Sequence, residues 1–345
     1  MRLCRTRQRG AATLVFILGL FLAMALATLA IHRNLVFAQR ASANQARATQ
    51  AYEAAEAGAE WALAQLNNTH PIGADCLPSD GAGALSFRDR FLLLDTATAR
   101  FTPTNATPPI CMRSAAGWAC GCTSGGVSTI AALPASDELA PAFALRFVAD
   151  PHAGVVRIVA SGCTSLAGTC LPGSSTVPDA AAQVSVALAL YGALRRPPSS
   201  ALTAPASFPA LFGIDKASWA RQPAVATVEC ASDCSSAISE TIATGASMIW
   251  VDDDVTLATP TTLGSAGHPV MIVAAGRARI ESGVTVVGAI YANTVAFEGG
   301  RVQGAVISAT TFDGSPVANF DADVLALLAR ANGSFVRISG SWRDF

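Results

Sequence analysis

The chain has 345 residues, of which 51% are hydrophobic and only 14% are charged, and its formal net charge is -1. This length and apolar content predict sizeable folded cores and exclude an intrinsically disordered protein. A near-neutral chain also lacks the basic footprint of a nucleic-acid-binding protein, so no nucleic-acid partner is expected.

The N-terminal segment combines a basic start with a long apolar run. Residues 11–31 carry no charge, and their length matches one crossing of the roughly 30 Å hydrocarbon core of a bilayer. The basic flank before them is expected to hold the N-terminus in the cytoplasm. We therefore expect one membrane span, with the remainder of the chain in the periplasm or at the cell surface. The basic residues are Arg2, Arg5, Arg7 and Arg9.

Two processing routes fit this segment. A secretory signal peptide would be removed at the small residues of Ala25-Leu26-Ala27. Cleavage on the cytoplasmic side, between Gly10 and Ala11, would instead leave the apolar run on the mature protein. No proline interrupts the pattern as far as Leu66, which predicts one helix of about 84 Å over residues 11–66. A helix that continues through the apolar run favours the second route.

The polar half of this helix, residues 32–66, favours close packing. Twelve of the 29 residues between Ala38 and Leu66 are alanine, a strong helix former whose small side chain lets neighbouring elements approach. Basic and acidic side chains lie on nearly opposite faces, which indicates either a solvated surface or charge pairing with other helices. The basic face holds Arg33, Arg40 and Arg47, and the acidic face holds Glu53, Glu56 and Glu60.

Eight of the nine cysteines lie beyond the basic leader, which contains Cys4. An even number on the oxidising side of a membrane predicts disulfides, whose connectivity the sequence leaves open. Two pairs are close enough to close local loops, Cys230 with Cys234 and Cys163 with Cys170. A zinc site formed by the other four is the alternative, but that region lacks a second tightly spaced pair. The eight candidates are Cys76, Cys111, Cys120, Cys122, Cys163, Cys170, Cys230 and Cys234.

Three stretches at the N-terminus carry a resemblance to a known family. They are Arg9-Gly10-Ala11, the 21-residue apolar continuation, and the sequence Ala-Ala-Glu-Ala-Gly-Ala-Glu-Trp-Ala at residues 54–62. Together they resemble the N-terminal region of PilX-like minor pilins of the type IV pilus. The resemblance implies that a prepilin peptidase cuts after Gly10 and that the new N-terminal residue, Ala11, is methylated.

Position 15 departs from the pattern of major pilins, most of which carry glutamate at the fifth mature position. Here the residue is Val15, and PilX-like proteins and GspK-like pseudopilins of type II secretion share the absence. A buried glutamate would neutralise the N-terminal amine of an adjacent subunit, so a subunit without it suits the first or tip position. The resemblance implies a structural minor pilin, and a GspK-like minor pseudopilin is the alternative.

The resemblance also implies partners and a location. The expected partners are other minor pilins, the major pilin, the prepilin peptidase and a large adhesin at the pilus tip. The expected location is the bacterial inner membrane, with a single span and periplasmic C-terminal domains, followed by the pilus at the cell surface.

Beyond the helix, short runs typical of strands occur at residues 143–148, 155–160 and 183–191. A proline-rich stretch, residues 196–212, indicates a linker because prolines cannot donate ladder hydrogen bonds. Apolar runs then begin at Val270, Val286 and Val302, sixteen residues apart and separated by glycines. This repeat predicts a small parallel β-solenoid, with irregular antiparallel packing as the alternative.

A last helix is predicted over residues 321–330, where it would cap the stack of coils. The C-terminal half also resembles PilX-related proteins at Pro269-Val270, at Gly288-Ala289-Ile290-Tyr291 and at the final six residues.

The expected fold class is α+β, with a long N-terminal helix packed on a pilin-like β-sheet and a β-rich C-terminal domain. The predicted division is a cytoplasmic prepilin leader (1–10), a transmembrane part of the helix (11–31), a periplasmic part (32–66), a pilin-like β domain with disulfides (67–195), a linker (196–212) and a β-rich repeat domain with a C-terminal helix (213–345).

No pattern in the sequence indicates catalysis, so we expect neither an enzyme nor a cofactor or metal. The carboxylates of Asp252-Asp253-Asp254 suit calcium in type, but the run lacks the spaced ligands of a calcium loop and fits a charged turn. An exported β-solenoid enzyme or carbohydrate binder is the rival from another class. It would need two opposed carboxylates, and the predicted coils carry few acids beyond Glu281 and Glu298. The four histidines, His32, His70, His152 and His268, lie far apart in the sequence.

Overall fold

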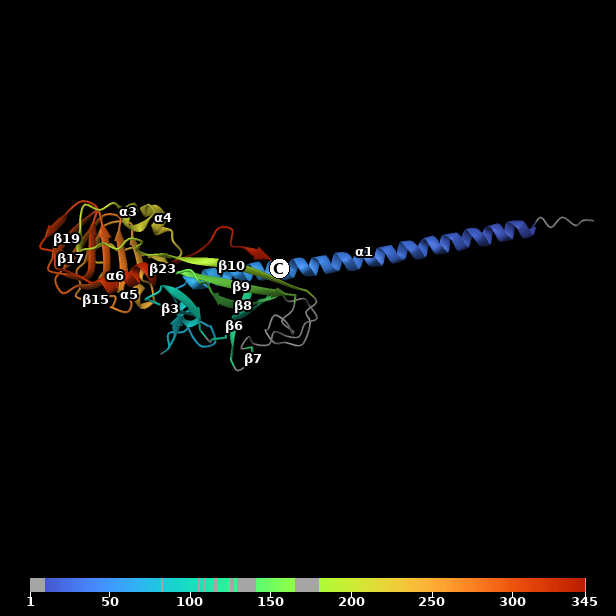
Figure 1. Cartoon of the computed structure of the whole chain (residues 1–345), viewed down its shortest axis with the longest axis horizontal. Coiled ribbons are helices and arrows are strands. Elements are labelled where there is room, and N and C mark those ends of the chain that lie inside the picture. The colour runs from blue at the N-terminus through green and yellow to red at the C-terminus, as the bar shows by residue number, and fades with distance from the viewer. Residues whose placement is uncertain are drawn as a thin grey trace, which may run out of the picture. The chain divides into compact units, whose positions relative to one another are not determined.

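The computed structural model of the chain describes residues 10–344 apart from positions 82, 105, 108, 115–116, 125–126, 129–140 and 165–179. The chain divides after Gln50 into two compact units. Helix α1 (Gly10–Asn67) has 58 residues, forms the described part of the first unit and continues into the second (Figure 1). The predicted long N-terminal helix is therefore confirmed, while the leader before Gly10 lies outside the described residues.

An antiparallel sheet occupies the first part of the second unit. Its strands run in the order β23-β10-β9-β8-β5-β6-β7, and β24 also pairs with β10. The three runs predicted as strands are present as β8, β9 and β10. The strands are β5 (Pro109–Ser114), β6 (Gly117–Ser124), β7 (Val127–Ser128), β8 (Ala142–Ala149), β9 (Val155–Cys163), β10 (Ala181–Gly192), β23 (Gly333–Arg337) and β24 (Arg343–Asp344).

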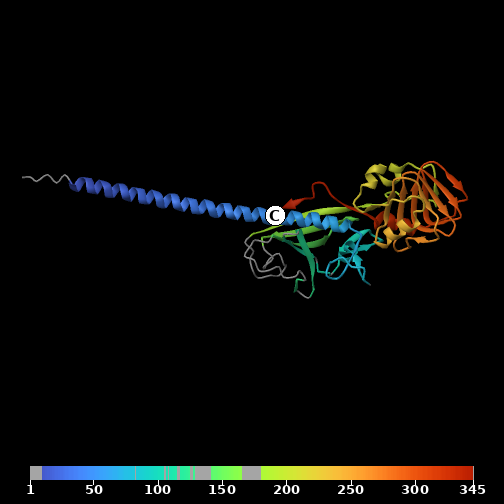
Figure 2. The ribbon, with the colours of Figure 1, turned by 180° about the vertical axis from the view of Figure 1, so that it is seen from behind.

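The C-terminal part of α1 lies against this sheet in both views of the ribbon (Figures 1 and 2). Two glycines allow the close approach. A Cβ atom at Gly162 would overlap the carbonyl oxygen of Ala51 and the backbone nitrogen of Ala55, and one at Gly58 would lie 2.9 Å from the ring of Phe143. Helix and sheet backbones therefore meet with no side chain between them at Gly162.

Short elements connect α1 to the sheet and complete its core. Helix α2 (Phe87–Phe91) buries both of its phenylalanines, and its N-cap Ser86 accepts a hydrogen bond from the Asp89 backbone. Two small antiparallel pairs flank it, β1 (Pro71–Ile72) with β2 (Leu85–Ser86) and β3 (Leu92–Asp95) with β4 (Arg100–Pro103).

Two parallel sheets make up most of the chain after residue 200, and the chain alternates between them. One sheet has the order β11-β20-β18-β16-β13-β12, with β15 on β18 and β22 on β20, and the other has the order β14-β17-β19-β21. The first contains β11 (Leu202–Thr203), β12 (Val225–Thr227), β13 (Met248–Val251), β15 (Thr262–Leu263), β16 (Val270–Ala274), β18 (Thr285–Ala292), β20 (Arg301–Ser308) and β22 (Ala318–Phe320). The second contains β14 (Val255–Leu257), β17 (Arg277–Glu281), β19 (Thr294–Glu298) and β21 (Phe312–Gly314).

Aligned apolar residues hold these coils together. Ile249, Ile272, Ile290 and Val306 are in register on four successive strands and lie in the core between the sheets. The neighbouring row points to the other face, as alternation along a strand requires. That row is Trp250, Val273, Tyr291 and Ile307. The prediction of parallel strands is therefore confirmed for this region. The pairings of the described strands do not, however, join the two sheets into a closed solenoid.

The predicted sixteen-residue repeat holds for only one of its two steps. Val286 pairs with Val302, sixteen positions later, but Val270 pairs with Gly288, eighteen positions later. The difference arises because β18 is long enough to pair with two short strands, β15 along its first part and β16 along its second. A turn between β15 and β16 shifts the register, and the spacing of valines does not reveal it.

Three short helices cover the outer face of the first parallel sheet. They are α3 (Phe208–Phe212), α4 (Lys216–Ala220) and α6 (Ala322–Arg330), and their buried side chains share one core with that face. Helix α6 begins after the N-cap Asp321, as predicted, but Leu325 and Leu328 pack against the face of the sheet. The expectation that α6 caps the end of the stack is therefore wrong. Helix α5 (Ser235–Ala243) buries Ile238 in the core between the sheets.

Two boundaries differ from the predicted division of the chain. The range 196–212 does not form a free linker, because it contains β11, which pairs with β20, and α3, which buries Phe208 and Phe212. The end of the chain also leaves the repeat region, because β23 and β24 pair with β10 of the antiparallel sheet. Composition predicts proline-rich segments as linkers, but here tertiary contacts order the segment.

The close approach at Gly162 gives a first test. Replacing Gly162 with alanine should lower the free energy of unfolding by about 2 kcal/mol or more, because a Cβ would push the helix and sheet backbones apart. Urea unfolding of the detergent-solubilised full chain, followed by near-ultraviolet circular dichroism, measures the change. Gly267→Ala is the matched control, since a Cβ there would meet nothing within 4 Å. Equal losses in both variants would contradict the close contact.

Candidate functional site: the exposed helix and its attachment to the sheet

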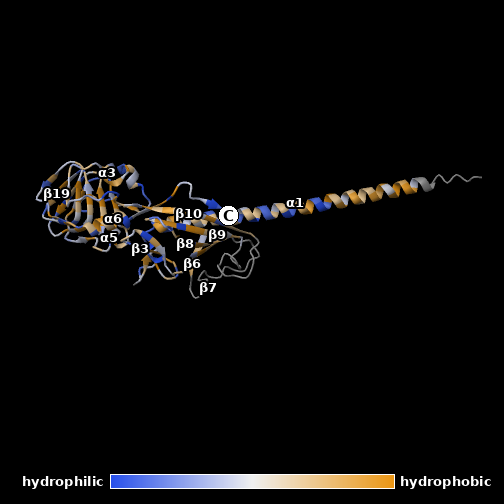
Figure 3. Cartoon of the chain, viewed as in Figure 1, coloured by the Kyte–Doolittle hydropathy of each residue, from blue (hydrophilic) through white to orange (hydrophobic). Residues whose placement is uncertain are grey.

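The N-terminal half of α1 exposes large apolar side chains on all sides. Among the described residues, α1 provides the one helix long and apolar enough to cross a membrane. Figure 3 shows these apolar residues concentrated toward the N-terminal end of the helix, with polar residues toward its middle. An uncovered apolar surface of this extent is unstable in water and needs lipid or other helices around it. The exposed residues include Leu14, Val15, Phe16, Ile17, Leu18, Phe21, Leu22, Leu26, Leu29, Ile31, Leu35 and Phe37.

The predicted processing residues lie at the start of this surface. Gly10 and Ala11 are the first residues of α1, and Arg2, Arg5, Arg7 and Arg9 lie outside the described residues. Val15 is 68% exposed, so its apolar side chain stands on the helix surface.

From Ala51 onward, one face of α1 is buried, and most of the buried side chains are small. Ala51, Ala54, Ala55, Ala59 and Ala62 are at most 2% exposed, and the last three share a core with the antiparallel sheet. The alanines from which close packing was predicted therefore pack against the sheet of the same chain. Larger rings flank the alanines, with the ring of Trp61 centred 5.4 Å from that of Phe87.

A buried asparagine ties the end of α1 to the C-terminal strand. Asn67 is 6% exposed, its Oδ1 accepts from the backbone N–H of Phe335 at 2.7 Å, and its Nδ2 donates to the Phe335 carbonyl at 3.0 Å. Nδ2 also donates to the carbonyl of Leu63 at 3.1 Å. One side-chain amide thus satisfies two backbone groups of Phe335, which lies 268 positions further along the chain.

The acidic face of α1 is partly neutralised within the chain. Glu60 forms an ion pair with Arg337 of β23, and Arg337 also lies over the ring of Trp342. Glu60 therefore has a partner in its own chain. This differs from both interpretations of the acidic face, a solvated surface and charge pairing with other helices. The sequence pattern did not reveal this pair because Arg337 is remote in sequence.

Disulfides reinforce the region around the antiparallel sheet. Cys76 is bonded to Cys122, and Cys111 is bonded to Cys120 across neighbouring strands β5 and β6. These two bonds use all four thiols that the zinc alternative requires. Cys163 is disulfide-bonded, and Cys170 lies outside the described residues.

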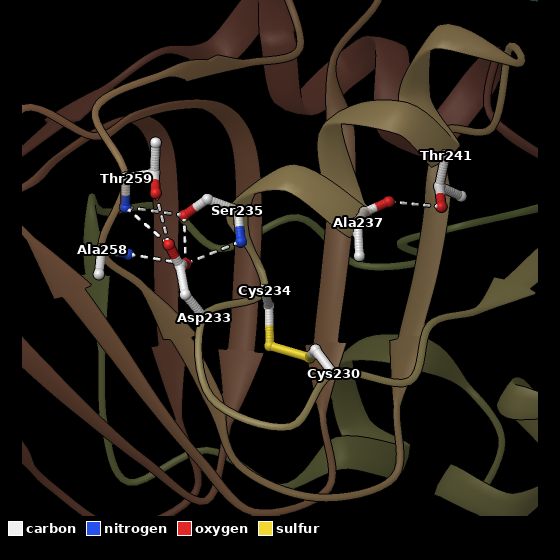
Figure 4. The surroundings of a disulfide bond; sticks show 8 residues. All are labelled: Cys230, Asp233, Cys234, Ser235, Ala237, Thr241, Ala258 and Thr259. Atoms are coloured by element: carbon white, nitrogen blue, oxygen red, sulfur yellow. Dashed lines mark hydrogen bonds between the residues drawn. A yellow bond between two sulfur atoms is a disulfide. The ribbon is translucent and has the colours of Figure 1, made fainter.

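A third disulfide, Cys230–Cys234, closes a small loop beside a network centred on Asp233 (Figure 4). Asp233 Oδ1 accepts from the backbone and hydroxyl of Ser235 at 2.9 and 2.7 Å, and its Oδ2 accepts from the Thr259 hydroxyl at 2.6 Å. These hydrogen bonds favour the ionised carboxylate and hold the pKa of Asp233 well below its usual range, with the Thr259 hydroxyl the largest contributor. The network joins the Cys230–Cys234 loop to the turn after β14. Both carboxylate oxygens accept hydrogen bonds from N–H and O–H groups of the protein.

The acidic run at residues 252–254 does not form a calcium-type cluster. Asp252 Oδ1 accepts from the indole of Trp250 at 2.7 Å, and Asp254 Oδ1 accepts from the backbone N–H of Arg277 at 2.7 Å. No group of three His, Cys, Asp or Glu side chains in the described part of the chain is arranged to hold a metal ion. The carboxylates of Asp252 and Asp254 thus accept hydrogen bonds from residues of β13 and β17.

Glu281 and Glu298, the acids of the predicted coils, are register partners on the neighbouring strands β17 and β19. Glu281 and Glu298 approach the same arginine, Arg279, at 4.0 and 3.5 Å, which is an ion-pair arrangement. Of the four histidines, His152 has a neighbouring carboxylate. Its Nδ1 lies 2.7 Å from Asp150 Oδ1 on an exposed turn.

Comparison with known proteins gives no match: no family model fits the chain, and neither a curated protein nor a solved structure matches it.

The Asn67 amide gives a second test. Asn67→Ala should cost roughly 2–5 kcal/mol of unfolding free energy, because it leaves the buried N–H and C=O of Phe335 without partners. Asn68→Ala is the control, since Asn68 is exposed and only bonds the His70 backbone nearby. Urea unfolding of both variants measures the difference, and similar stabilities would contradict a structural role for the Asn67 pairing.

The Asp233 network gives a third test, through pH. The carboxylate has a depressed pKa in the folded chain, so its contribution is present above the pKa of about 3.9 that Asp has when unfolded and declines as the pH falls below it. Asp233→Asn should therefore lower the thermal midpoint at pH 7 and differ less from the parent chain near pH 3. Asp253→Asn, on the exposed turn, serves as the control. A difference that does not change with pH would overturn the role assigned to the charge.

Proposed function

We propose that the chain is a PilX-like minor pilin, a structural subunit that enters a helical pilus assembly through the N-terminal half of α1. The observation that carries the proposal is the division of α1 into two kinds of surface. Its first half is apolar and exposed, and its second half is attached to a folded unit by alanine and glycine contacts. A subunit held in a bilayer and later transferred to a bundle of similar helices needs this combination, because lipid and helices both cover apolar surface.

The residues at the N-terminus support the same proposal. Gly10 and Ala11 form the processing junction that the resemblance implies, and the apolar run after them matches the thickness of a bilayer. In this proposal the peptidase acts at the cytoplasmic face of the inner membrane and the mature chain keeps its helix. The membrane span is then a stage before assembly into the pilus.

Val15 supports a position at the start or tip of the assembly. A carboxylate at this position would neutralise the amine of a neighbouring subunit, and a buried amine without a partner is costly. A subunit with valine at this position cannot neutralise the N-terminal amine of a neighbouring subunit. It is therefore suited to be the first subunit, which has no such neighbour to neutralise. The other minor pilins, the major pilin and a tip adhesin are the partners of this proposed role.

The processing step tests the proposal. Co-expression with a bacterial prepilin peptidase should give a mature chain that begins at Ala11, as read by mass spectrometry of the N-terminal peptide. Gly10→Lys should stop cleavage, because the small residue at the scissile bond is lost, whereas Gly19→Ala within the apolar run should be processed normally. A mature chain beginning at Thr28 would indicate a secretory signal peptide and overturn the proposal.

A further inference from the structure

A cavity of about 390 Å³ lies where the end of α1, helix α2 and the first coils of the parallel sheets meet. Its volume falls in the range of ligand-binding pockets. The wall is mixed, with apolar side chains beside amides, hydroxyls, one arginine and the carboxylate of Asp89. Lining residues include Asn68, Leu85, Arg88, Ala224, Ile242 and His268.

Arg88 is the cation in this wall, and it lacks a strong partner. Its side chain is 19% exposed, and its one ion-pair contact places Nε 3.8 Å from Asp89 Oδ1. Asp89 is itself 54% exposed and accepts a hydrogen bond from the Ser86 hydroxyl through Oδ2. Within the described residues, no side-chain hydrogen bond satisfies the Arg88 guanidinium.

This environment is unfavourable for a charge whose ion-pair contact is as long as 3.8 Å. Burial lowers the pKa of Arg88, which means that the surroundings destabilise its charged form. A guanidinium remains protonated in proteins nevertheless. An anion that supplied acceptors for the N–H groups of Arg88 would offset this cost.

A second hollow, of about 470 Å³, adjoins the cavity and extends it. The two share Asn67, Asn68, Thr69, Ala224 and Ala246 in their walls. The second hollow is also bordered by β12, the last strand of its sheet, which pairs with β13 alone among the described strands. A terminal strand presents backbone groups on its unpaired side, and these can receive another extended chain.

We propose that the cavity binds the C-terminal carboxylate of a partner polypeptide, whose last residues lie in extended form along β12. Arg88 donates two parallel N–H bonds to the carboxylate, which is the geometry that a planar guanidinium provides. The apolar wall around Leu85 and Ile242 receives the last side chain. Because Asp89 also lines the cavity, one arginine stands beside one acid, which favours a singly charged carboxylate over a phosphate dianion that would demand further donors.

Titration calorimetry on the full chain in detergent tests this proposal. The probe is an N-acetylated six-residue peptide of alternating valine and alanine with a free C-terminal carboxylate. Its comparison is the same peptide with a C-terminal amide. We expect saturable one-to-one binding of the acid and at least about tenfold weaker binding of the amide, as expected for loss of a charged hydrogen bond.

Variants of the chain identify the residue responsible. Arg88→Gln should weaken binding of the acid peptide about tenfold or more, and Arg146→Gln, an exposed arginine on β8, should leave it unchanged. Leu85→Glu places a negative charge in the cavity wall at a side chain that is 46% exposed and should also weaken binding. Thermal melts show whether each variant remains folded, and Leu85→Glu decides the matter if Arg88→Gln unfolds.

Three results would overturn the proposal. They are no binding of the acid peptide, equal binding of acid and amide, and binding that does not depend on Arg88 and Leu85 in folded variants. Succinate is titrated as a separate arm. If succinate bound as tightly as the peptide and with the same dependence on Arg88, the cavity would be a site for small organic acids and the assignment to a chain terminus would be wrong.

Discussion

The contact between the backbones of α1 and β9 is the constraint on which the rest of the structure depends. At Gly162 the strand approaches the helix at Ala51 and Ala55 with no side chain between them. Such an approach fixes both the height and the rotation of the helix against the sheet, because any neighbouring register would bring a Cβ into the gap. The alanines that follow along the helix can then be buried without large side chains separating the two elements.

Polar contacts at the end of α1 complete this attachment. Asn67 satisfies the backbone of Phe335, and Glu60 pairs with Arg337 two residues later on the same strand. The C-terminal strand is therefore held by β10 on one side and by α1 on the other. Disulfides stabilise the opposite part of the sheet, where Cys111–Cys120 joins two adjacent strands. The helix is thus attached to the sheet through contacts with β9 and with β23.

The sequence predicts the regular parts of this fold well. A long apolar run without proline predicts the helix, and short, largely apolar runs predict β8, β9 and β10, because both signals come from local sequence. It fails where distant segments decide the outcome. The step from Val270 to Gly288 depends on β15 sharing the long strand β18, and the ordering of residues 196–212 depends on pairing with β20.

The attachment residues were harder to predict than the helix itself. Nothing in the sequence around Asn67 indicates a partner 268 positions away. Gly162 had a usable signal, since an isolated glycine in a strand often marks a close backbone approach. Arg88 had none, because its burial is created by α2 and by segments from the far end of the chain. The exposed surface of α1, by contrast, is visible in composition alone.

The return of β23 to the antiparallel sheet has a consequence for how this architecture can vary. Gly192, the last residue of β10, pairs directly with Gly333, the first residue of β23. Everything between them is therefore an insertion that leaves and re-enters the sheet at one point. The insertion can gain or lose a coil of parallel strands without moving either end, so the helix and its sheet form a constant base on which stacks of different length can be carried.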